Sequence, residues 1–451
     1  RSVGPWMSAF AYGTTYFSAS VFIGFAGKQG WGFGPSALLI GVGNALVGAL
    51  AAWAILAKRT RRMTQNLDTM TMPEFLEARY QSEHIKMISA VIIFIFLLPY
   101  SASIFKGLGH LFESTFHISF DFALIILVVI TGIYLVLGGY FAVTVTSFIQ
   151  GIIMLVGAVI MICVLVYKAG GLTEAITTVN TNYPEHVPVA QQPNWLTIAS
   201  LIFMTSVGSW GLPQMVQKFY AIKNEKVIPK AAIITTIFAL VIGITAYGSG
   251  ILSHVFFDNN TVPKMANGGV NYDQIMPNLL AIKLPEALLA IIMLLILSAS
   301  MSSLASLVLV SASSIAVDLY KGYLKKDVNE KTSLIIMRSF SVLFIFATYL
   351  ISKLQLGFIV TMQSLSWGVL SGAFLAPYIF AIYSKKVTKA AAYAGIYSGA
   401  GSAIILTMAL GAANSALAAS IAIIVPFIVV PIVSAFTPKV DANVIEKAFK
   451  K

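Results

Sequence analysis

Long apolar runs alternate with short polar segments along the whole chain. A run of about 20 apolar residues is the length that an α-helix needs to cross the hydrocarbon core of a bilayer. Twelve runs meet this description, and each is predicted to be a membrane span: 5–26, 36–57, 86–109, 121–139, 147–168, 196–217, 231–255, 285–318, 335–352, 356–383, 389–412 and 416–436. The pattern predicts an all-α polytopic membrane protein, with both ends of the chain on one side of the lipid bilayer.

The polar segments on the side of the C-terminus are strongly basic. They are 58–85, 140–146, 218–230, 319–334, 384–388 and the tail from 437, and with the adjoining helix ends they hold all but six of the 29 Lys and Arg residues. The positive-inside rule makes this side cytoplasmic. We therefore expect a multi-pass protein of the cell (inner or plasma) membrane with a cytoplasmic C-terminus. The formal charge of +12 then reflects topology, and no nucleic-acid partner is expected.

Composition agrees with a membrane protein and narrows the function. Only 10% of the residues are charged and 58% are hydrophobic, whereas a soluble domain has roughly a quarter charged residues. The five His residues are scattered over span ends and loops without metal or acid–base spacing, which disfavours a membrane-embedded enzyme. A sensor that binds a solute without moving it is not excluded. We expect one transporter domain over 1–451 and no obligatory protein partner.

Two of the predicted spans carry residues that interrupt a helix. The first contains Gly13 within Tyr12-Gly-Thr-Thr-Tyr-Phe-Ser18, and the sixth contains Gly208, Gly211 and Pro213. Proline removes a backbone donor and each glycine weakens a helix. The first and sixth spans are corresponding members of two five-span halves, and paired broken helices of this kind point to an inverted-repeat transporter with its site at the breaks. The alternative is that these residues merely kink the two helices.

The eighth span carries small polar residues at its centre. Within Ser298-Ala-Ser-Met-Ser-Ser303, the residues Ala299, Ser302 and Ser303 are spaced i, i+3 and i+4, which places one carbonyl and two hydroxyls on one helix face. Hydroxyls in hydrocarbon need a polar partner. The face is therefore a candidate half-site for a small hard cation, and the alternative is close packing between helices.

Several motifs together resemble the sodium:solute symporter family. Ser302-Ser-Leu-Ala-Ser-Leu with Asp318-Leu-Tyr320 is similar to the signature helix of that family, and Arg1-Ser-Val-Gly-Pro5 to the loop before its first core helix. The matches continue with Gly138-Gly-Tyr-Phe-Ala-Val143 and Gln150-Gly151, Gly211-Leu-Pro-Gln214, and Lys385-Lys-Val-Thr-Lys389. They extend over almost the whole chain. Within the family, the first helix resembles the pantothenate and monocarboxylate branches, and the chain as a whole is similar to these and to the proline branch.

The resemblance implies a LeuT-like fold and a function. It implies core repeats at about 5–168 and 196–383, two additional helices at about 389–436 and a cytoplasmic tail at 437–451. A further helix is expected upstream of Arg1. The implied activity is sodium-driven import of a small organic solute by alternating access. The implied ligands of one Na⁺ are the carbonyls of Thr14, Phe17 and Ala299 and the hydroxyls of Ser302 and Ser303.

Two positions depart from the family pattern. Many members have an Asp, associated with ion coupling, where this chain has Ser147. Proton-coupled or uncoupled transport on the same fold therefore stays open as an alternative. Lys106 stands in the third span, where related members have apolar residues, and a charge there needs a partner or a wet cavity. It is predicted either to serve as a counter-charge or titrating group at the solute site, or to extend to the lipid headgroups.

The predicted solute site is mostly aromatic. Its candidates are Tyr16, Ser20, Tyr100, Lys106, Ser209, Trp210 and Gln363, with Trp367 beside them. A polyol would need many hydrogen-bonding groups, which this set lacks. A small carboxylate with an apolar body fits it better: a monocarboxylate, a pantothenate-like acid or an amino acid such as proline. The family's proline branch has an Asp where this chain has Tyr16, which lowers the expectation for proline.

Overall fold

The computed structural model describes residues 3–324 and 329–450, leaving out the side chains of 136–144, 323, 324 and 330. These residues are almost entirely helical. The first part of the chain forms α1 (Pro5–Tyr16), η1 (Ser20–Phe25), α2 (Ala26–Phe33), η2 (Gly34–Ala37), α3 (Leu38–Gly43), η3 (Asn44–Ala51), η4 (Trp53–Ala57), α4 (Lys58–Asn66), α5 (Met72–Tyr80), α6 (Glu83–Phe116) and α7 (Phe120–Lys168). The predicted motif at 138–143 lies outside the described side chains.

The remaining elements complete a bundle. The middle of the chain forms α8 (Leu172–His186), η5 (Val189–Gln191), α9 (Trp195–Ser206), η6 (Gly208–Gly211), α10 (Pro213–Tyr220), η7 (Glu225–Val227), α11 (Ile228–Ile251), α12 (Ser253–Phe256) and α13 (Tyr272–Lys283). The last part forms α14 (Glu286–Ser313), η8 (Ser314–Leu324), α15 (Glu330–Lys353), α16 (Ile359–Tyr383), α17 (Lys389–Leu410), η9 (Ala412–Asn414), α18 (Ser415–Phe436) and α19 (Ala442–Ala448).

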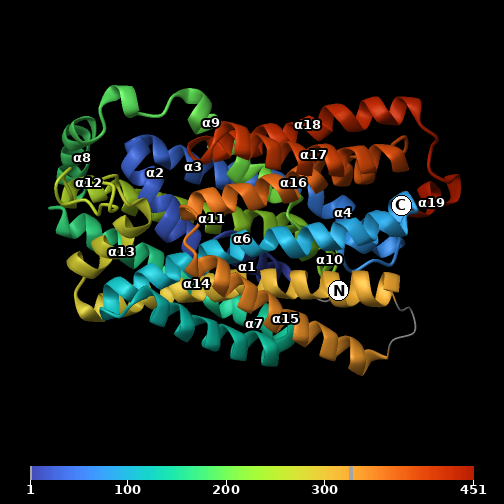
Figure 1. Ribbon diagram of the computed structural model, residues 1–451, viewed down its shortest axis with the longest axis horizontal. Helices are drawn as coiled ribbons and strands as arrows, with labels where there is room; N and C mark the ends of the chain where they lie inside the picture. The colour runs from blue at the N-terminus through green and yellow to red at the C-terminus, as the bar shows by residue number, and fades with distance from the viewer. Residues whose placement is uncertain (1–2, 325–328, 451) are drawn as a thin grey trace.

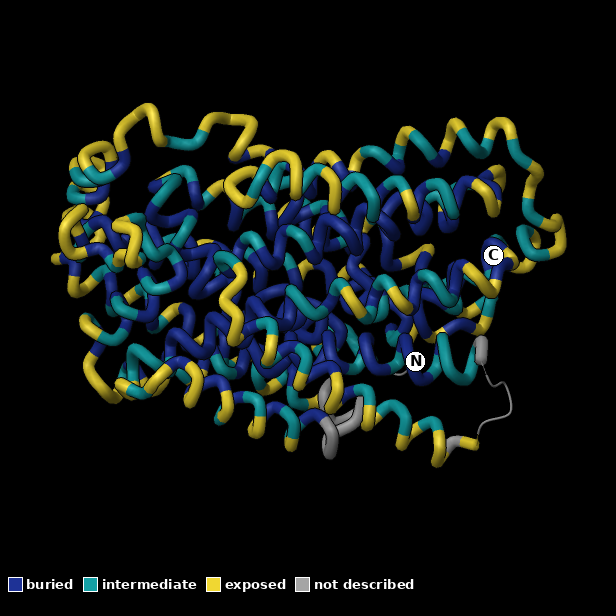
Figure 2. The backbone as a smooth tube through the Cα atoms, viewed as in Figure 1, coloured by how far each residue is buried: buried dark blue, intermediate teal, exposed yellow. Residues whose placement is uncertain are grey.

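The long helices run side by side along the long axis of the molecule (Figure 1). The short elements α8, α12 and α13 gather at one end, which we call the α13 end. Helices α4 and α19 lie at the opposite end, which we call the α4 end (Figure 1). Buried residues fill the middle of the bundle, and exposed residues follow its rim and the α13 end (Figure 2). The residues of the candidate ion site described below are among these buried residues.

Every predicted apolar run is helical, yet fewer helices pass a length test for spanning. In residues 3–324 and 329–450, nine helices are long and apolar enough to cross a membrane, or ten with the bent pair α9–α10. The sequence predicted twelve spans. Two helices are too short to pass alone, namely Pro5–Tyr16 and Phe120–Leu135. The stretch Ser20–Asn66 counts as one helix, because every residue in it is helical, although it covers the end of one predicted span and the whole of the next. The chain nevertheless turns within Ser20–Asn66, at Gly34. Its φ of 52° is a conformation that glycine adopts without strain.

Two contacts show that the chain reverses between predicted spans. The Tyr12 hydroxyl donates to the Gly48 carbonyl at 2.9 Å, so the chain after the turn at Gly34 returns to lie against α1. Within α7, the Tyr134 and Thr146 hydroxyls lie 2.7 Å apart. Twelve residues of straight helix would separate them by about 18 Å. The chain therefore folds back between these two residues, as the predicted pair of spans at 121–139 and 147–168 requires.

A histidine pair fastens α8 to the bundle at the α13 end. His254 Nε2 donates to the Trp31 carbonyl at 2.9 Å, so in the neutral ring its Nδ1 accepts from His186 Nδ1, also at 2.9 Å. Both imidazole rings stack on the Trp31 indole. Partial burial lowers the pKa of His186, against the opposing charges of Asp258 and Glu185. The hydrogen bond between the rings requires that His254 Nδ1 carry no proton, and the partial burial of His186 disfavours a charge on its ring.

Acidification should loosen α8. Because the pKa of His186 is lower in the folded state than in the unfolded chain, this contribution to stability is complete above about pH 6.5 and is lost as the pH falls. The protection of the α8 amides, that is, their exchange relative to the intrinsic rate at each pH, should therefore decrease between pH 7.5 and pH 5.5 in the parent. In His186→Gln this protection should depend far less on pH, and an equal dependence in both proteins would contradict this assignment.

Candidate ion and solute sites

The helix breaks place backbone carbonyls inside the bundle. Helix α1 ends at Tyr16, and Phe17 is extended, with φ −110° and ψ 125°. The prediction that Gly13 forms this break is wrong, because Gly13 lies within α1. Its lack of a side chain instead admits the ring of Phe238, which a Cβ would meet at 2.6 Å. The second break is as predicted: Gly208–Gly211 is a 3₁₀ turn, and α10 starts at Pro213 with a bend of 48°.

Four of the five predicted sodium ligands come together at the first break. The Ser303 hydroxyl lies 3.1 Å from the Thr14 carbonyl, 3.3 Å from that of Thr15 and 3.4 Å from that of Phe17. The Ser302 hydroxyl donates to Thr14 Oγ1 at 2.8 Å. One hydroxyl proton can satisfy only one of three carbonyls at a time, so oxygen lone pairs remain available for a cation. We call Thr14, Phe17, Ser302 and Ser303 the ion cluster.

The other two predicted positions adjoin this cluster. Ala299 is fully buried one turn before Ser303 on α14. Ser147, where the family Asp was expected, has its hydroxyl 3.1 Å from that of Ser302. The position that departs from the family pattern therefore touches a predicted ligand directly. It contributes a neutral oxygen where a carboxylate would contribute a charge.

The chemistry of this set suits a small hard cation. All its donors are hydroxyl or carbonyl oxygens, which bind alkali and alkaline-earth ions in preference to transition metals. Among the described residues, no group of three or more His, Cys, Asp or Glu could hold a metal ion. Unwound carbonyls at a helix break are the arrangement that coordinates Na⁺ in broken-helix transporters. The residues present therefore fit sodium.

A small cavity lies directly beside the ion cluster. Its volume is about 10 Å³, the space of roughly one water molecule, so a solute can enter only when the lining side chains move apart. Its lining residues are Tyr16, Phe17, Val21, Phe25, Asn44, Thr205, Tyr247, Gln363 and Trp367. Phe17 belongs to both sites, since its carbonyl faces Ser303 and its side chain lines the cavity. Ion and solute sites thus share one backbone segment.

Two polar groups at the cavity are buried without a partner in the described structure. They are Oε1 of Gln363, an acceptor, and Nε1–H of Trp367, a donor. The side chain of Asn44 is already engaged, because its Oδ1 accepts from Thr205 at 2.8 Å and from Ser206 at 3.1 Å. Buried polar groups are normally paired. One acceptor and one donor are therefore available to a bound solute.

The other predicted solute residues lie outside the cavity lining. Ser20 is hydrogen-bonded to Ser103 at 2.9 Å, and Ser209 donates to the Ser206 carbonyl at 2.8 Å. Trp210 donates to the Val47 carbonyl at 3.1 Å, and Tyr100 packs edge-on against Trp367. Sequence reasoning missed Asn44, Thr205 and Tyr247. For Asn44 a signal was present, since it is a single amide within the apolar run 36–57.

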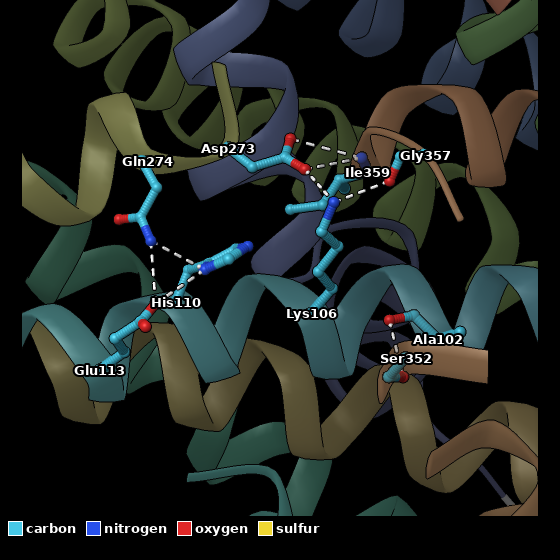
Figure 3. Close-up of polar contacts among 9 residues, drawn as sticks. All are labelled: Ala102, Lys106, His110, Glu113, Asp273, Gln274, Ser352, Gly357 and Ile359. Carbon is cyan, nitrogen blue, oxygen red and sulfur yellow. Dashed lines mark hydrogen bonds and ion pairs between the residues drawn. The ribbon is translucent and has the colours of Figure 1, made fainter. Parts of the chain in front are cut away.

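Lys106 is buried in an ion pair with Asp273, which lies between the predicted spans 231–255 and 285–318. Its Nζ lies 2.8 Å from Asp273 Oδ2 and donates to the Gly357 carbonyl at 2.7 Å (Figure 3). The Lys106 and Asp273 side chains are 6% and 0% exposed. Asp273 also accepts from the Ile359 amide, so the pair joins α6, α13 and the start of α16 (Figure 3).

This geometry changes both interpretations of Lys106. The ammonium does not extend to the headgroups, because it is enclosed at the α13 end. It also has a carboxylate of the protein as its counter-charge, so a solute carboxylate is not needed to neutralise it. Beside it, His110 Nδ1 lies 3.1 Å from Glu113, and both contact Gln274 of α13 (Figure 3). These contacts fasten α13 over the bundle.

The fold and the broken-helix oxygen cluster define a secondary transporter of the LeuT type. A Na⁺-coupled sialic acid symporter superimposes with a TM-score of 0.79 at 17% identity, covering 97% of this chain and 91% of that one. The transporter MhsT, solved with L-phenylalanine, gives 0.56 at 14% identity, covering 97% and 99%. At these identities the likeness concerns the fold.

Sequence comparison gives the family. The profile of the sodium:solute symporter family matches residues 1–399, and the chain belongs to that family. A sodium/proline symporter of Staphylococcus aureus (strain bovine RF122 / ET3-1) is 30% identical over 419 residues, which covers 89% of this chain and 78% of the relative. Sodium/proline symporter 2 of Staphylococcus saprophyticus is 29% identical over 411 residues, with the same coverage. The predicted resemblance, LeuT-like fold and sodium coupling are thereby confirmed.

Proposed function

We propose that this protein imports a small zwitterionic amino acid, with L-proline as the first candidate, together with one Na⁺. The observation that carries the proposal is Phe17, whose carbonyl belongs to the ion cluster and whose side chain lines the cavity. Sodium bound by Thr14, Phe17, Ala299, Ser302 and Ser303 would fix the conformation of the break. A solute that needs the same conformation then binds more tightly when sodium is present.

The groups that line the cavity suit a compact solute that has one hydrogen-bond acceptor, one donor and an apolar body. A carboxylate can accept from Trp367 Nε1–H, and an ammonium can donate to Gln363 Oε1. The rings of Tyr16, Phe17 and Phe25 and the side chain of Val21 cover apolar carbons. The proline specificity of the staphylococcal relatives favours this solute over a monocarboxylate, which has no ammonium group.

We place the α4 end in the cytoplasm. Lys58, Arg59, Arg61 and Arg62 lie there on α4, and the positive-inside rule puts such a cluster inside the cell. The C-terminal helix α19 lies at the same end and would be cytoplasmic (Figure 1). The α13 end, with the Lys106–Asp273 pair, then faces outward. The protein acts as a transporter without catalysing a covalent reaction, in accord with its relatives.

Reconstitution tests the proposal. Proteoliposomes with an inwardly directed Na⁺ gradient should accumulate radiolabelled L-proline above equilibrium, and replacing Na⁺ with choline should abolish the accumulation. Pantothenate and lactate serve as competing solutes of the rival carboxylate class. Accumulation driven equally well by a proton gradient without Na⁺ would contradict the proposed coupling. Failure of proline with success of a competitor would contradict the proposed solute.

A further inference from the structure

Lys218 carries a positive charge into the interior beside the ion cluster. The sequence assigned it to the polar segment 218–230, whereas the structure places it in α10, immediately after the second helix break. Its Nζ donates to the Ser306 hydroxyl at 3.0 Å. Among the residues that the structure describes, no carboxylate lies within 4 Å of this ammonium. Its charge is therefore not neutralised by an ion pair.

Ser306 connects this ammonium to the ion cluster. Its hydroxyl is 3.0 Å from that of Thr15 and 3.2 Å from the carbonyl of Ser302. The carbonyl of Thr15 is in turn one of the three within reach of the Ser303 hydroxyl. The positive charge of Lys218 thus lies about two hydrogen bonds from the oxygens proposed to hold sodium. At this range, two like charges repel each other appreciably even with strong protein screening.

The ammonium lies on the α4 side of the cluster. Ser306 follows Ser303 by nearly one turn along α14, in the direction that leads through η8 to Asp318. Asp318 accepts from Thr71, the N-cap of α5, at 2.6 Å, so this direction leads toward the basic segments.

We infer that Lys218 tunes the sodium affinity of the ion cluster: its tethered ammonium repels the bound ion, weakens Na⁺ binding and so speeds release of the ion from the cluster. The inference rests on the proposed ion site. A unit charge two hydrogen bonds away, roughly 6–8 Å, with the effective dielectric constant of about 20 that suits protein sites, weakens cation binding roughly 30- to 100-fold. Ser306 holds the ammonium at the edge of the cluster, where it repels the ion without replacing it.

Removing the charge should tighten sodium binding and slow transport. In Lys218→Met, the NaCl concentration that gives half of the thermal stabilisation should fall roughly 30- to 100-fold relative to the parent, with choline chloride keeping the ionic strength constant. Net Na⁺-driven uptake of L-proline should slow because sodium leaves slowly. Exchange of internal for external proline at saturating Na⁺ on both sides should persist, since exchange does not require the emptied carrier. Replacing a residue that has only a packing role would affect net uptake and exchange alike.

Controls keep the test decisive. Lys218→Arg retains the charge and should behave as the parent, and Lys226→Met removes an exposed charge nearby and should change neither sodium affinity nor net uptake. Lys218→Gln, whose amide can still donate to Ser306, serves if the Met variant does not fold. Unchanged or weaker sodium binding in the charge-free variants overturns the inference while leaving the ion site intact. A parent that sodium does not stabilise overturns both.

Discussion

Replacing Asp273 with Asn should lower the free energy of unfolding by about 3–5 kcal/mol, because it leaves the buried Lys106 ammonium without a counter-charge. The asparagine oxygen can still accept from the Ile359 amide, so the loss reports mainly on charge. A thermal unfolding curve in detergent should show the change as a lower transition temperature. The Lys106→Met/Asp273→Asn double variant should recover much of the loss, since no unpaired charge remains.

An exposed pair in the same structure provides the comparison. Lys353 and Asp121 lie 3.6 Å apart, with side chains 48% and 54% exposed. Water and salt screen such a pair, so Asp121→Asn should cost about 0–1 kcal/mol. If the two Asp variants unfold at the same temperature, or if the double variant is no more stable than Asp273→Asn, burial of the Lys106 pair does not have the assigned consequence.

Replacing Ser303 with Ala should weaken sodium binding by roughly 10- to 150-fold, the range for losing one hydrogen-bond-strength contact of about 1.5–3 kcal/mol to a charged group. The Ser303 hydroxyl is the single side-chain group within reach of the Thr14, Thr15 and Phe17 carbonyls in the described structure. The measurement is the rise in unfolding temperature as NaCl replaces choline chloride at constant ionic strength. Sodium-driven solute uptake by the Ser303→Ala variant should fall as its sodium binding weakens.

The same helix offers a matched control for Ser303. Ser311 is also fully buried on α14, but its hydroxyl has no hydrogen-bond partner among the described residues, so Ser311→Ala should leave the sodium response unchanged. Ser302→Ala should also weaken sodium binding, because the Ser302 hydroxyl contacts both Thr14 and Ser147. A Ser303→Ala protein with the sodium midpoint of the parent would remove this residue from the ligand set.

The fold was predictable because hydropathy and helix breaks are local properties. Each apolar run became a helix, and Pro213 starts α10 as its fixed φ and missing N–H predict. Gly13 shows the limit of such reasoning. A glycine within a helix can mark a break or admit a neighbouring ring, and the approach of Phe238, more than 200 residues away in the sequence, decides between them.

The ion cluster was largely predictable, whereas the charged partners were not. Ser302 and Ser303 stand out because hydroxyls in an apolar helix need a partner. For Lys106, sequence alone indicated that a partner was required, but Asp273 is one of seventeen acidic residues, and its pairing depends on how α13 docks. The position of Lys218 could not be predicted from the sequence for the same reason. Its place beside Ser306 follows from the bend between α9 and α10, whose direction no local pattern specifies.

The replacement of a carboxylate by Ser147 decides which half of the transport cycle responds to voltage. Because the oxygens around Ser302 and Ser303 in the described structure are all neutral, the sodium-loaded site carries a positive charge and the empty site carries none, so the membrane potential acts on the loaded carrier. A zwitterionic solute adds no net charge, so each import cycle would carry one elementary charge across the bilayer. Every 100 mV of inside-negative membrane potential then contributes about 2.3 kcal/mol to accumulation. Voltage, as well as the sodium concentration gradient, would drive this transporter.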